Sequence, residues 1–498
     1  MKVLAHLHAV PLRPGLGISP ERRPAKPTAP RIGPLLRSLL IPALMAGLAA
    51  CTQGLDDDEM PKASRAEGAQ YVFGGESLAE LHLSFTEDDW NSLLKRYDKN
   101  ENTKYTIPCS VVYIKDGETS RLDSVGFRLR GRSSRQRPEG RRGQTHQAAD
   151  TDWHHFHFGL NFNKYIDGSR HSLHGQRKLW AKWPHEDPSY MREHYSFDLF
   201  QRYGVWTAPS VAFCRVYLKV QGDGREAYLG VFNLIEPLDG NFVKKNEDRF
   251  GGADGFLWKC SLGAQLNNQS GQTYGYEKEN SEKDYTYELK TQTEQYEAAK
   301  AQLKGFISQI NSLKGEAFDQ WMAAHCDVEQ LLRMYAVNVI LGMWDDYWGN
   351  ANNFFLYFNS QDPDNYKVYM LPYDYDNSLG TTFPYYVEDP GTHSPLDWGP
   401  SSRPFIYKIL QNAEWKQFYV SCLKELADPG KDLFHWDHSR DRLTQWRNQI
   451  ETWVSNDTGE DMKIQDKPAS WSGIKTYRIY TAGKHNFFQV RTAVIEDM

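Results

Sequence analysis

Polar and apolar residues alternate along six short segments in the first half of the chain, and this period of two predicts strands. The six segments are residues 78–85, 105–114, 124–131, 154–165, 210–220 and 226–236. Helical patterns interrupt them at 86–97 and 185–204, where Thr86 and Asp187 are the expected N-caps. We expect an α+β region in which strands dominate.

After residue 240 the apolar positions recur three and four residues apart, which predicts helices packed against a core. The clearest helical segments are residues 294–313, 327–344 and 403–427. Two further strands, 354–358 and 366–372, flank a strong turn signal at 362–365 and form a predicted hairpin. The chain is therefore predicted to place a strand-rich half before a helix-rich half, with a hinge-like break at 236–240.

A short apolar run at residues 35–50 ends in Leu-Ala-Ala before Cys51. It is too short and too interrupted for a secure membrane span and is typical of a secretory signal. Small residues before a cysteine resemble the cleavage box of bacterial lipoproteins, so we predict a signal peptide over 1–51 and lipidation of Cys51. An ordinary secretory signal with a chance cysteine is the alternative. The polar, acidic residues 52–75 are predicted to tether an exported, membrane-anchored protein.

Composition narrows the choice of partners. The 498 residues include 40% hydrophobic residues, enough for two or three lobes around a sizeable core. The formal net charge of −6 gives no overall attraction to nucleic acid, so we expect none as a partner, and we expect a monomer. Six cysteines are present, and the five that remain after Cys51 have no zinc or redox spacing. We expect buried free thiols and at most a single disulfide.

Oxygen ligands are concentrated where the predicted helix 327–344 ends, in the stretch DDYWGNANN at 345–353. The predicted hairpin then leads into Tyr-Asp-Tyr-Asp-Asn at 373–377, and it returns these acids to the first stretch. Carboxylates and amides without His or Cys favour Mg²⁺ or Mn²⁺, the cations of phosphoryl transfer. The alternative is that these residues only cap helices and form turns.

The order of these parts matches protein kinases, in which an Asp that orients the acceptor hydroxyl is followed five residues later by a metal-binding Asn. Asp345 and Asn350 have this separation, so Asp345 is the candidate catalytic residue. The candidate metal ligands are Asn350, Asp374 and Asp376. We expect the neighbouring Asp346 to face solvent or to cap the loop.

An arginine-rich segment, GFRLRGRSS at 126–134, occupies the place of a phosphate-binding loop. Arginine pairs bidentately with phosphate, and serine hydroxyls and loop amides can also donate hydrogen bonds. The candidate phosphate contacts are Arg130, Arg132, Ser133 and Ser134. A solvated basic loop or a nucleic-acid patch is the alternative.

Five motifs together resemble the CotH family of atypical protein kinases, over about residues 76–430: SVGFRLRGRSS, DPSYMREHYSFDLFQRYGV, YLGVFNLIEPLDGNFV, DDYWGNANNFFLY and LPYDYDNSLG. The resemblance implies a reduced kinase-like bilobal fold, with an N-lobe at 76–240 and a C-lobe at 241–498. It implies ATP as the phosphate donor, Mg²⁺ or Mn²⁺ as the metal, and Ser, Thr or Tyr of a surface or coat protein as the acceptor. Glu236 to Leu238 would be the hinge that meets adenine.

One departure concerns the lysine that binds the α- and β-phosphates. Where the family has lysines on a strand, this chain reads HFHFGLN at 155–161. The residues that could replace that lysine are Lys164, Lys178, Lys182 and Arg130, with Glu193 as an expected ion-pair partner. A pseudokinase lipoprotein that acts as a scaffold or adhesin is therefore an alternative. A carbohydrate-active lipoprotein with Asp345 and Asp374 as paired carboxylates is a further one.

Overall fold

The computed structural model describes residues 62–75, 77–148, 151–168, 171–268, 270–278, 282–460 and 463–498. The predicted signal peptide, Cys51 and the first part of the predicted tether lie outside these ranges. The last part of the tether segment instead forms helix α1 (Lys62–Phe73), because Ala69, Val72 and Phe73 are buried against the body of the protein. Throughout the described ranges, every helix is too short or too polar to cross a membrane.

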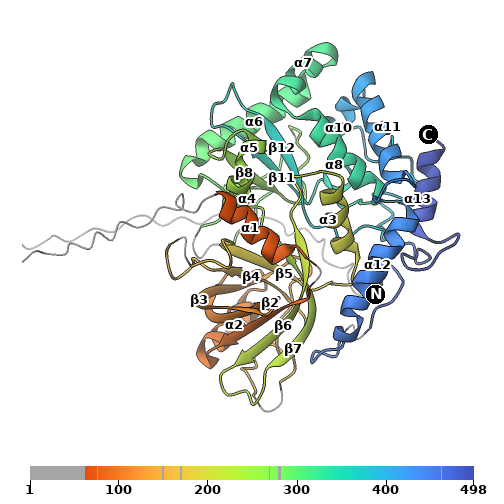
Figure 1. The fold of residues 1–498 in the computed structure, drawn as a ribbon. Coiled ribbons are helices and arrows are strands. Elements are labelled where there is room, and N and C mark those ends of the chain that lie inside the picture. Colours follow the sequence, from red (N-terminus) through yellow and green to blue (C-terminus); the bar gives the residue numbers. More distant parts are fainter. Residues whose placement is uncertain are drawn as a thin grey trace, which may run out of the picture. The chain divides into compact units, whose positions relative to one another are not determined.

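Seven strands close into a barrel in the order β1-β2-β3-β4-β5-β7-β6 (Figure 1). Their bounds are β1 Ala79–Phe85, β2 Ile107–Lys115, β3 Glu118–Arg130, β4 His157–Asn161, β5 Lys178–Lys182, β6 Val211–Val220 and β7 Ala227–Ile235. The predicted alternation is clearest in β1 and β2, where every second residue enters the apolar core of the barrel, and in the second half of β3, where Val125, Phe127 and Leu129 do so. A parallel pairing of β1 with β6 closes the barrel, whereas the other neighbours are antiparallel.

Two helices accompany the barrel strands. Helix α2 (Glu87–Lys99) begins as predicted after Thr86, whose side chain accepts a hydrogen bond from the Asp89 amide. Helix α3 (Arg192–Arg202) is shorter than predicted. The prediction that Asp187 is its N-cap is wrong, because the N-cap is Met191 and residues 188–190 form a turn. The Asp187 carboxylate still accepts a hydrogen bond from the Arg192 amide at 2.9 Å.

The second half of the chain contains a five-stranded sheet, ordered β12-β11-β8-β10-β9. Its strands are β8 Phe256–Cys260, β9 Tyr274–Tyr276, β10 Tyr287–Leu289, β11 Phe354–Phe358 and β12 Val368–Pro372. The predicted hairpin is confirmed, because β11 and β12 pair antiparallel with Phe354 opposite Pro372. Residues 353 and 373 therefore lie at the same end of the hairpin, one just before β11 and the other just after β12.

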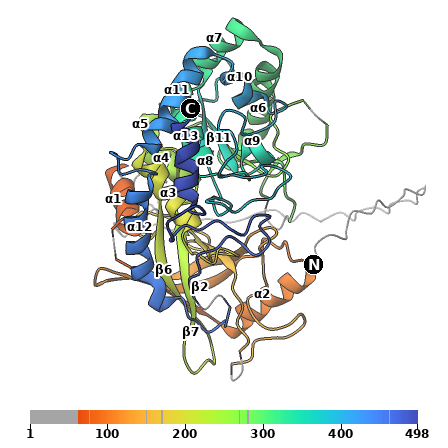
Figure 2. The same ribbon diagram turned by 90° about the vertical axis from the view of Figure 1, so that its right-hand side faces the viewer.

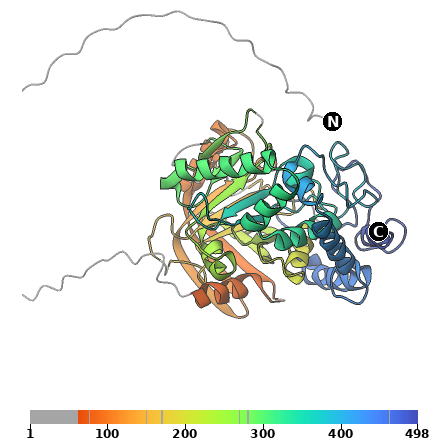
Figure 3. The same cartoon turned by 90° about the horizontal axis from the view of Figure 1, so that it is seen from above.

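Helices surround this sheet, as the helical spacing after residue 240 predicted. Short helices α4 (Gly240–Lys245) and α5 (Glu247–Phe250) follow the barrel directly. The remaining helices are α6 Tyr296–Ser312, α7 Gly315–His325, α8 Val328–Ile340, α9 Tyr347–Asn350, α10 Pro404–Ile409, α11 Ala413–Ala427, α12 Trp436–Ile450 and α13 Phe487–Glu496. Helix α11 packs against both α8 and α13 (Figure 2), and in the view from above the blue C-terminal helices lie on the side away from the orange strands (Figure 3).

The α+β class is thus confirmed, while the closed barrel was not predicted. The five cysteines among the described residues are free and buried, as expected for most of them.

Candidate functional site

Asp345 lies between the end of α8 and the single turn of α9, and side-chain amides hold both of its carboxylate oxygens. Oδ1 accepts hydrogen bonds from Asn350 at 2.5 Å and Asn352 at 3.1 Å. Oδ2 accepts from Asn353 at 3.0 Å and Asn377 at 3.3 Å. Burial raises the pKa of Asp345 to about 6, although these amides oppose the shift. The result is a fixed carboxylate that is more basic than an exposed one.

Asp346 has a different role from its neighbour. It is buried, and its carboxylate accepts from the Gly349 amide at 2.7 Å and from the Asn338 side chain at 2.8 Å. Burial raises the pKa of Asp346 to about 7. The expectation that it caps the loop is right, since it is the N-cap of α9, but it does not face solvent. Its side chain is a structural element of the loop that carries Asp345.

The β11–β12 hairpin brings Asp374 and Asp376 to the Asp345 loop. Asn377, the next residue, donates the hydrogen bond to Asp345 described above. The charge on Asp374 also acts on the Asp345 carboxyl, and the charge on Asp345 acts on Asp376. Three of the four predicted catalytic and metal-binding residues, namely Asp345, Asp374 and Asp376, therefore lie close together. The fourth, Asn350, donates a hydrogen bond to Asp345.

Lys182, at the end of β5, is the lysine that reaches these acids. Its Nζ lies 2.7 Å from Oε1 of Glu193 on α3 and 3.4 Å from Asp376, and it also forms an ion pair with Asp374. The other candidates lie elsewhere: Lys178 pairs with Asp239 at 3.4 Å, and Lys164 is exposed. Of the three candidate lysines, Lys182 is the one that contacts Glu193 and the acids after β12.

In this cluster the carboxyl groups outnumber the cations. Burial raises the pKa of Glu193 to about 7 and holds that of Asp376 well above its ordinary value. Burial alone would raise the pKa of Asp374, but the charge of Lys182 outweighs this effect and lowers that pKa below its ordinary value. Burial alone would lower the pKa of Lys182, but the neighbouring acids outweigh it and raise that pKa well above its ordinary value. One lysine thus faces several buried carboxyl groups, which is an environment suited to a further cation.

The donor set determines which cation fits. Among the described residues, no group of three or more His, Cys, Asp and Glu side chains is placed to hold a metal ion unaided. Asp374 and Asp376 supply two carboxylates, and Asn350, which bonds Asp345 through Nδ2, can add an amide oxygen. Mg²⁺ is characteristically bound by one or two carboxylates together with substrate phosphates, not by an all-protein cage. The residues fit a cation that arrives with a nucleotide.

The predicted phosphate loop is mostly strand. Strand β3 continues to Arg130, and the turn begins only at Gly131, which has φ 97°. The Arg130 guanidinium lies 4.1 Å from the Trp180 ring centre and donates to the Tyr373 hydroxyl at 3.3 Å. Gly159 makes this possible, since a Cβ there would lie 2.9 Å from Arg130 Cδ. Arg130 is therefore held beside the acidic loop that follows Tyr373.

The other predicted nucleotide-binding residues lie in the turn after β3 or have partners elsewhere in the protein. Arg132 and Ser133 are exposed in the turn after β3, and Ser134 is half-buried there. The Glu236 side chain forms an ion pair with Lys245 and accepts from the Ser210 amide at 3.2 Å.

Leu238 is fully buried in an apolar cluster with Phe242 and Leu371. Because the Glu236 and Leu238 side chains already have partners in the protein, the segment 236–238 could contact a nucleotide only through its backbone groups.

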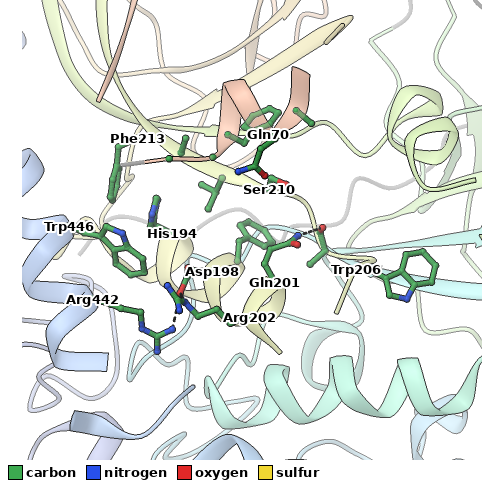
Figure 4. A pocket seen from close by; sticks show the side chains of 18 of the residues that line it. Gln70, His194, Asp198, Gln201, Arg202, Trp206, Ser210, Phe213, Arg442 and Trp446 are labelled. Atoms are coloured by element: carbon green, nitrogen blue, oxygen red, sulfur yellow. Dashed lines mark hydrogen bonds and ion pairs between the residues drawn. The ribbon is translucent and has the colours of Figure 1, made fainter. Parts of the chain in front are cut away.

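A pocket of about 1010 Å³ lies on another face of α3 (Figure 4). His194, Asp198, Gln201 and Trp446 are among the residues that line it, whereas Lys182, Asp345 and Asp374 are not. The concentration of acids therefore does not coincide with this pocket. The candidate active site is the region where β5, the Asp345 loop and the acids after β12 meet.

Sequence reasoning did not assign Asn352 or Asn377 to the site. Both donate to Asp345, and both stand beside residues that were assigned. The repeated asparagines of DDYWGNANN were a usable signal, because a buried carboxylate needs several donors.

Comparison with families of known proteins matches residues 128–482 to the family described as CotH kinase protein. Comparison with curated proteins found no match to the chain. The matched range contains β4, β5, α3 and the loops that carry the acids.

Proposed function

The chain belongs to the CotH kinase protein family, and on this premise we propose that it is a metal-dependent protein kinase that transfers the γ-phosphate of ATP to a protein hydroxyl group. The observation that carries the proposal is the position of Lys182. It joins Glu193 of α3 to Asp374 and Asp376, next to a carboxylate that four amides orient. This set combines one phosphate-binding cation, two metal-binding acids and one base.

Lys182 would bind a phosphate of ATP, and Glu193 would hold its ammonium group in place. Asp345 would accept the proton of the acceptor hydroxyl. Its pKa of about 6 leaves it ionised at neutral pH but more basic than an ordinary aspartate, which suits a general base. Asn352, Asn353 and Asn377 would fix its orientation, so that little reorganisation is needed in the transition state.

Asp374 and Asp376, with the amide oxygen of Asn350, would hold a Mg²⁺ or Mn²⁺ ion. When bound, such an ion supplies positive charge that offsets the negative charge of the transferred phosphate. Arg130, held beside Tyr373, would add a guanidinium on the strand side of the site.

The proposal extends to architecture and location. The strand-rich residues 76–240 would serve as an N-lobe on the nucleotide side, and 241–498 as a C-lobe. The protein would be an exported, monomeric lipoprotein, anchored through Cys51, that acts on surface or coat proteins. Residues 236–240, which join strand β7 to helix α4, would be the hinge between these two parts.

The test is phosphoryl transfer by the purified full chain with Mn²⁺ and labelled ATP, using cell-surface proteins as acceptors. Asp345→Asn should abolish transfer but still bind Mn²⁺-ATP in a calorimeter. The double variant Asp374→Ala, Asp376→Ala should lose metal-dependent nucleotide binding. Asp364→Asn, an exposed position in the hairpin turn, is the matched control and should behave as wild type. A wild-type chain that binds nucleotide but never transfers phosphate would favour the pseudokinase scaffold.

A further inference from the structure

Three nitrogen-bearing side chains form a row across neighbouring strands of the barrel. Arg130 of β3 is directly opposite His157 of β4. The pairing of Phe158 with Ala181 places His157 opposite Lys182 in the next position of the β4–β5 ladder. Directly opposed residues of antiparallel strands point to the same face. Since Phe158 and Ala181 belong to the barrel core, this row lies on the outer face.

The two ends of the row have partners in the protein. Arg130 contacts Trp180 and Tyr373, and Lys182 contacts Glu193 and the acids after β12. These contacts direct the row toward the loop that begins at Tyr373.

His157, in the middle, differs from its neighbours. It is 3% exposed, and its Nδ1 has no hydrogen-bond partner in the described part of the chain. Its ring centre lies 6.0 Å from that of His185 and 6.2 Å from that of Trp183, so its surroundings are aromatic on one side. Burial, with Lys182 as the next cause, holds the pKa of His157 well below its ordinary value, so the imidazole is neutral. A buried nitrogen without a partner destabilises a fold unless a ligand or water completes it.

We infer that His157 donates a hydrogen bond from Nδ1 to a phosphate oxygen of the bound nucleotide. Neighbouring strands lie about 5 Å apart, so the backbone positions of Arg130, His157 and Lys182 follow one another at about this interval along one line. An anionic chain of phosphates laid along that line would meet all three. The positive charges of Arg130 and Lys182 on either side favour an anion over a metal ion at His157 itself. The inference rests on the proposed function, because it concerns the nucleotide of the same site.

The test compares the binding of ATP and of adenosine to the full chain by calorimetry, with Mn²⁺ present. His157→Phe keeps the ring and removes the donor, so ATP affinity should fall by about tenfold while adenosine affinity stays unchanged. His157→Asn keeps a donor near the position of Nδ1 and should restore most of the ATP affinity. His155→Phe is the control, because His155 is also buried and stacks on Trp183 with ring centres 4.2 Å apart, but bonds the Leu229 carbonyl.

The outcomes separate the two proposals. Equal losses for ATP and adenosine in His157→Phe would show a purely structural role, and unchanged ATP binding would show that water completes Nδ1; either result overturns this inference alone. Absence of nucleotide binding by the wild type would overturn the proposed function with it. If His157→Phe does not fold, ¹⁵N-histidine spectra of the wild type decide: ATP should shift the His157 Nδ1 signal, identified by its loss in His157→Asn, and adenosine should not.

Discussion

The Nζ atom of Lys182 lies 2.7 Å from Oε1 of Glu193, and this ion pair joins the end of a barrel strand to helix α3. The Glu193 side chain is buried and that of Lys182 is only 12% exposed, so neither group is well solvated without the other. The same lysine contacts Asp374 and Asp376, which links α3 to the loop after β12. The position of α3 and the state of the acidic loop are therefore coupled through one ammonium group.

Replacing Lys182 should disable the site. Lys182→Met removes the only cation that contacts Glu193, Asp374 and Asp376 among the described residues, and transfer should fall by about 10²-fold or more. Initial rates with labelled ATP measure this effect. Lys178→Met is the control, since Lys178 lies at the other end of β5, is 43% exposed and forms an ion pair with Asp239, the N-cap of α4. Its loss should change the rate less than about threefold. Equal effects of the two substitutions would contradict the assignment.

Asp345 and Asp346 should respond differently to substitution. Asp345→Ala should lower turnover by orders of magnitude with little change in ATP affinity, because a base acts in the transition state. Asp346→Ala removes the N-cap of α9 and leaves the side-chain NH2 group of Asn338 without its acceptor, so it should destabilise the fold by about 2 kcal/mol. Turnover numbers and thermal unfolding curves separate the two effects. A folded but inactive Asp346→Ala protein would shift the catalytic assignment by one residue.

The sequence predicted the acidic loops well because their geometry is local. A turn signal at 362–365 is sufficient to pair β11 with β12, and that pairing alone returns Asp374 toward Asp345. The choice of Lys182 over Lys164 and Lys178 could not be made in this way. It depends on β5 lying between β4 and β7, strands that are separated by the whole of α3 and β6.

Barrel closure and the burial of Asp346 were unpredictable for a similar reason. The pairing of β1 with β6 joins residues more than a hundred positions apart, and no local pattern encodes it. Asp346 resembles an exposed cap in the sequence, and only its contact with Asn338 on α8 shows that it is internal. The end of the tether segment forms α1 because Ala69, Val72 and Phe73 are buried against the rest of the protein. Its sequence has no apolar face at helical spacing from which the helix could have been predicted.

The pH dependence of transfer should reflect Asp345. Its pKa is raised to about 6, and a base must be deprotonated to work, so turnover should fall as the pH decreases through about 6. Asn353→Ala removes a donor to the ionised carboxylate and should move this acidic limb to higher pH. Rate profiles between pH 5 and 8 at saturating ATP provide the measurement. A limb that stays in place in Asn353→Ala would argue that another group controls it.

Membrane attachment should depend on Cys51. The small residues before it and the acidic stretch after it are the features on which the lipoprotein prediction rests. Cys51→Ser should release the protein from the membrane fraction while leaving nucleotide binding unchanged. Fractionation followed by immunodetection tests this, with Cys109→Ser, a buried position of the barrel, as the control that should remain attached. Wild-type protein found wholly in the cytoplasm would refute export.

Acid stability should depend on Glu277, which links the second sheet to the barrel through an ion pair with Arg128 of β3. Burial opposes the shift, but Arg128 and Lys290 lower the pKa of Glu277 to about 2. A carboxyl whose pKa is lower in the folded state stabilises the fold above its unfolded value, near 4.5, and this contribution is lost as the pH falls from there toward 2. Since about a third of each side chain is exposed, solvent screening reduces it to about 1–2 kcal/mol.

Glu277→Gln should therefore lower the unfolding free energy at pH 7 by about that amount and have almost no effect near pH 2. Urea unfolding at the two pH values measures both. Glu316→Gln, on α7, is the control because Glu316 is exposed and accepts a hydrogen bond from Gln320 of the same helix. A loss of stability in Glu277→Gln that is equal at both pH values would show that the side chain acts by packing and not through its charge.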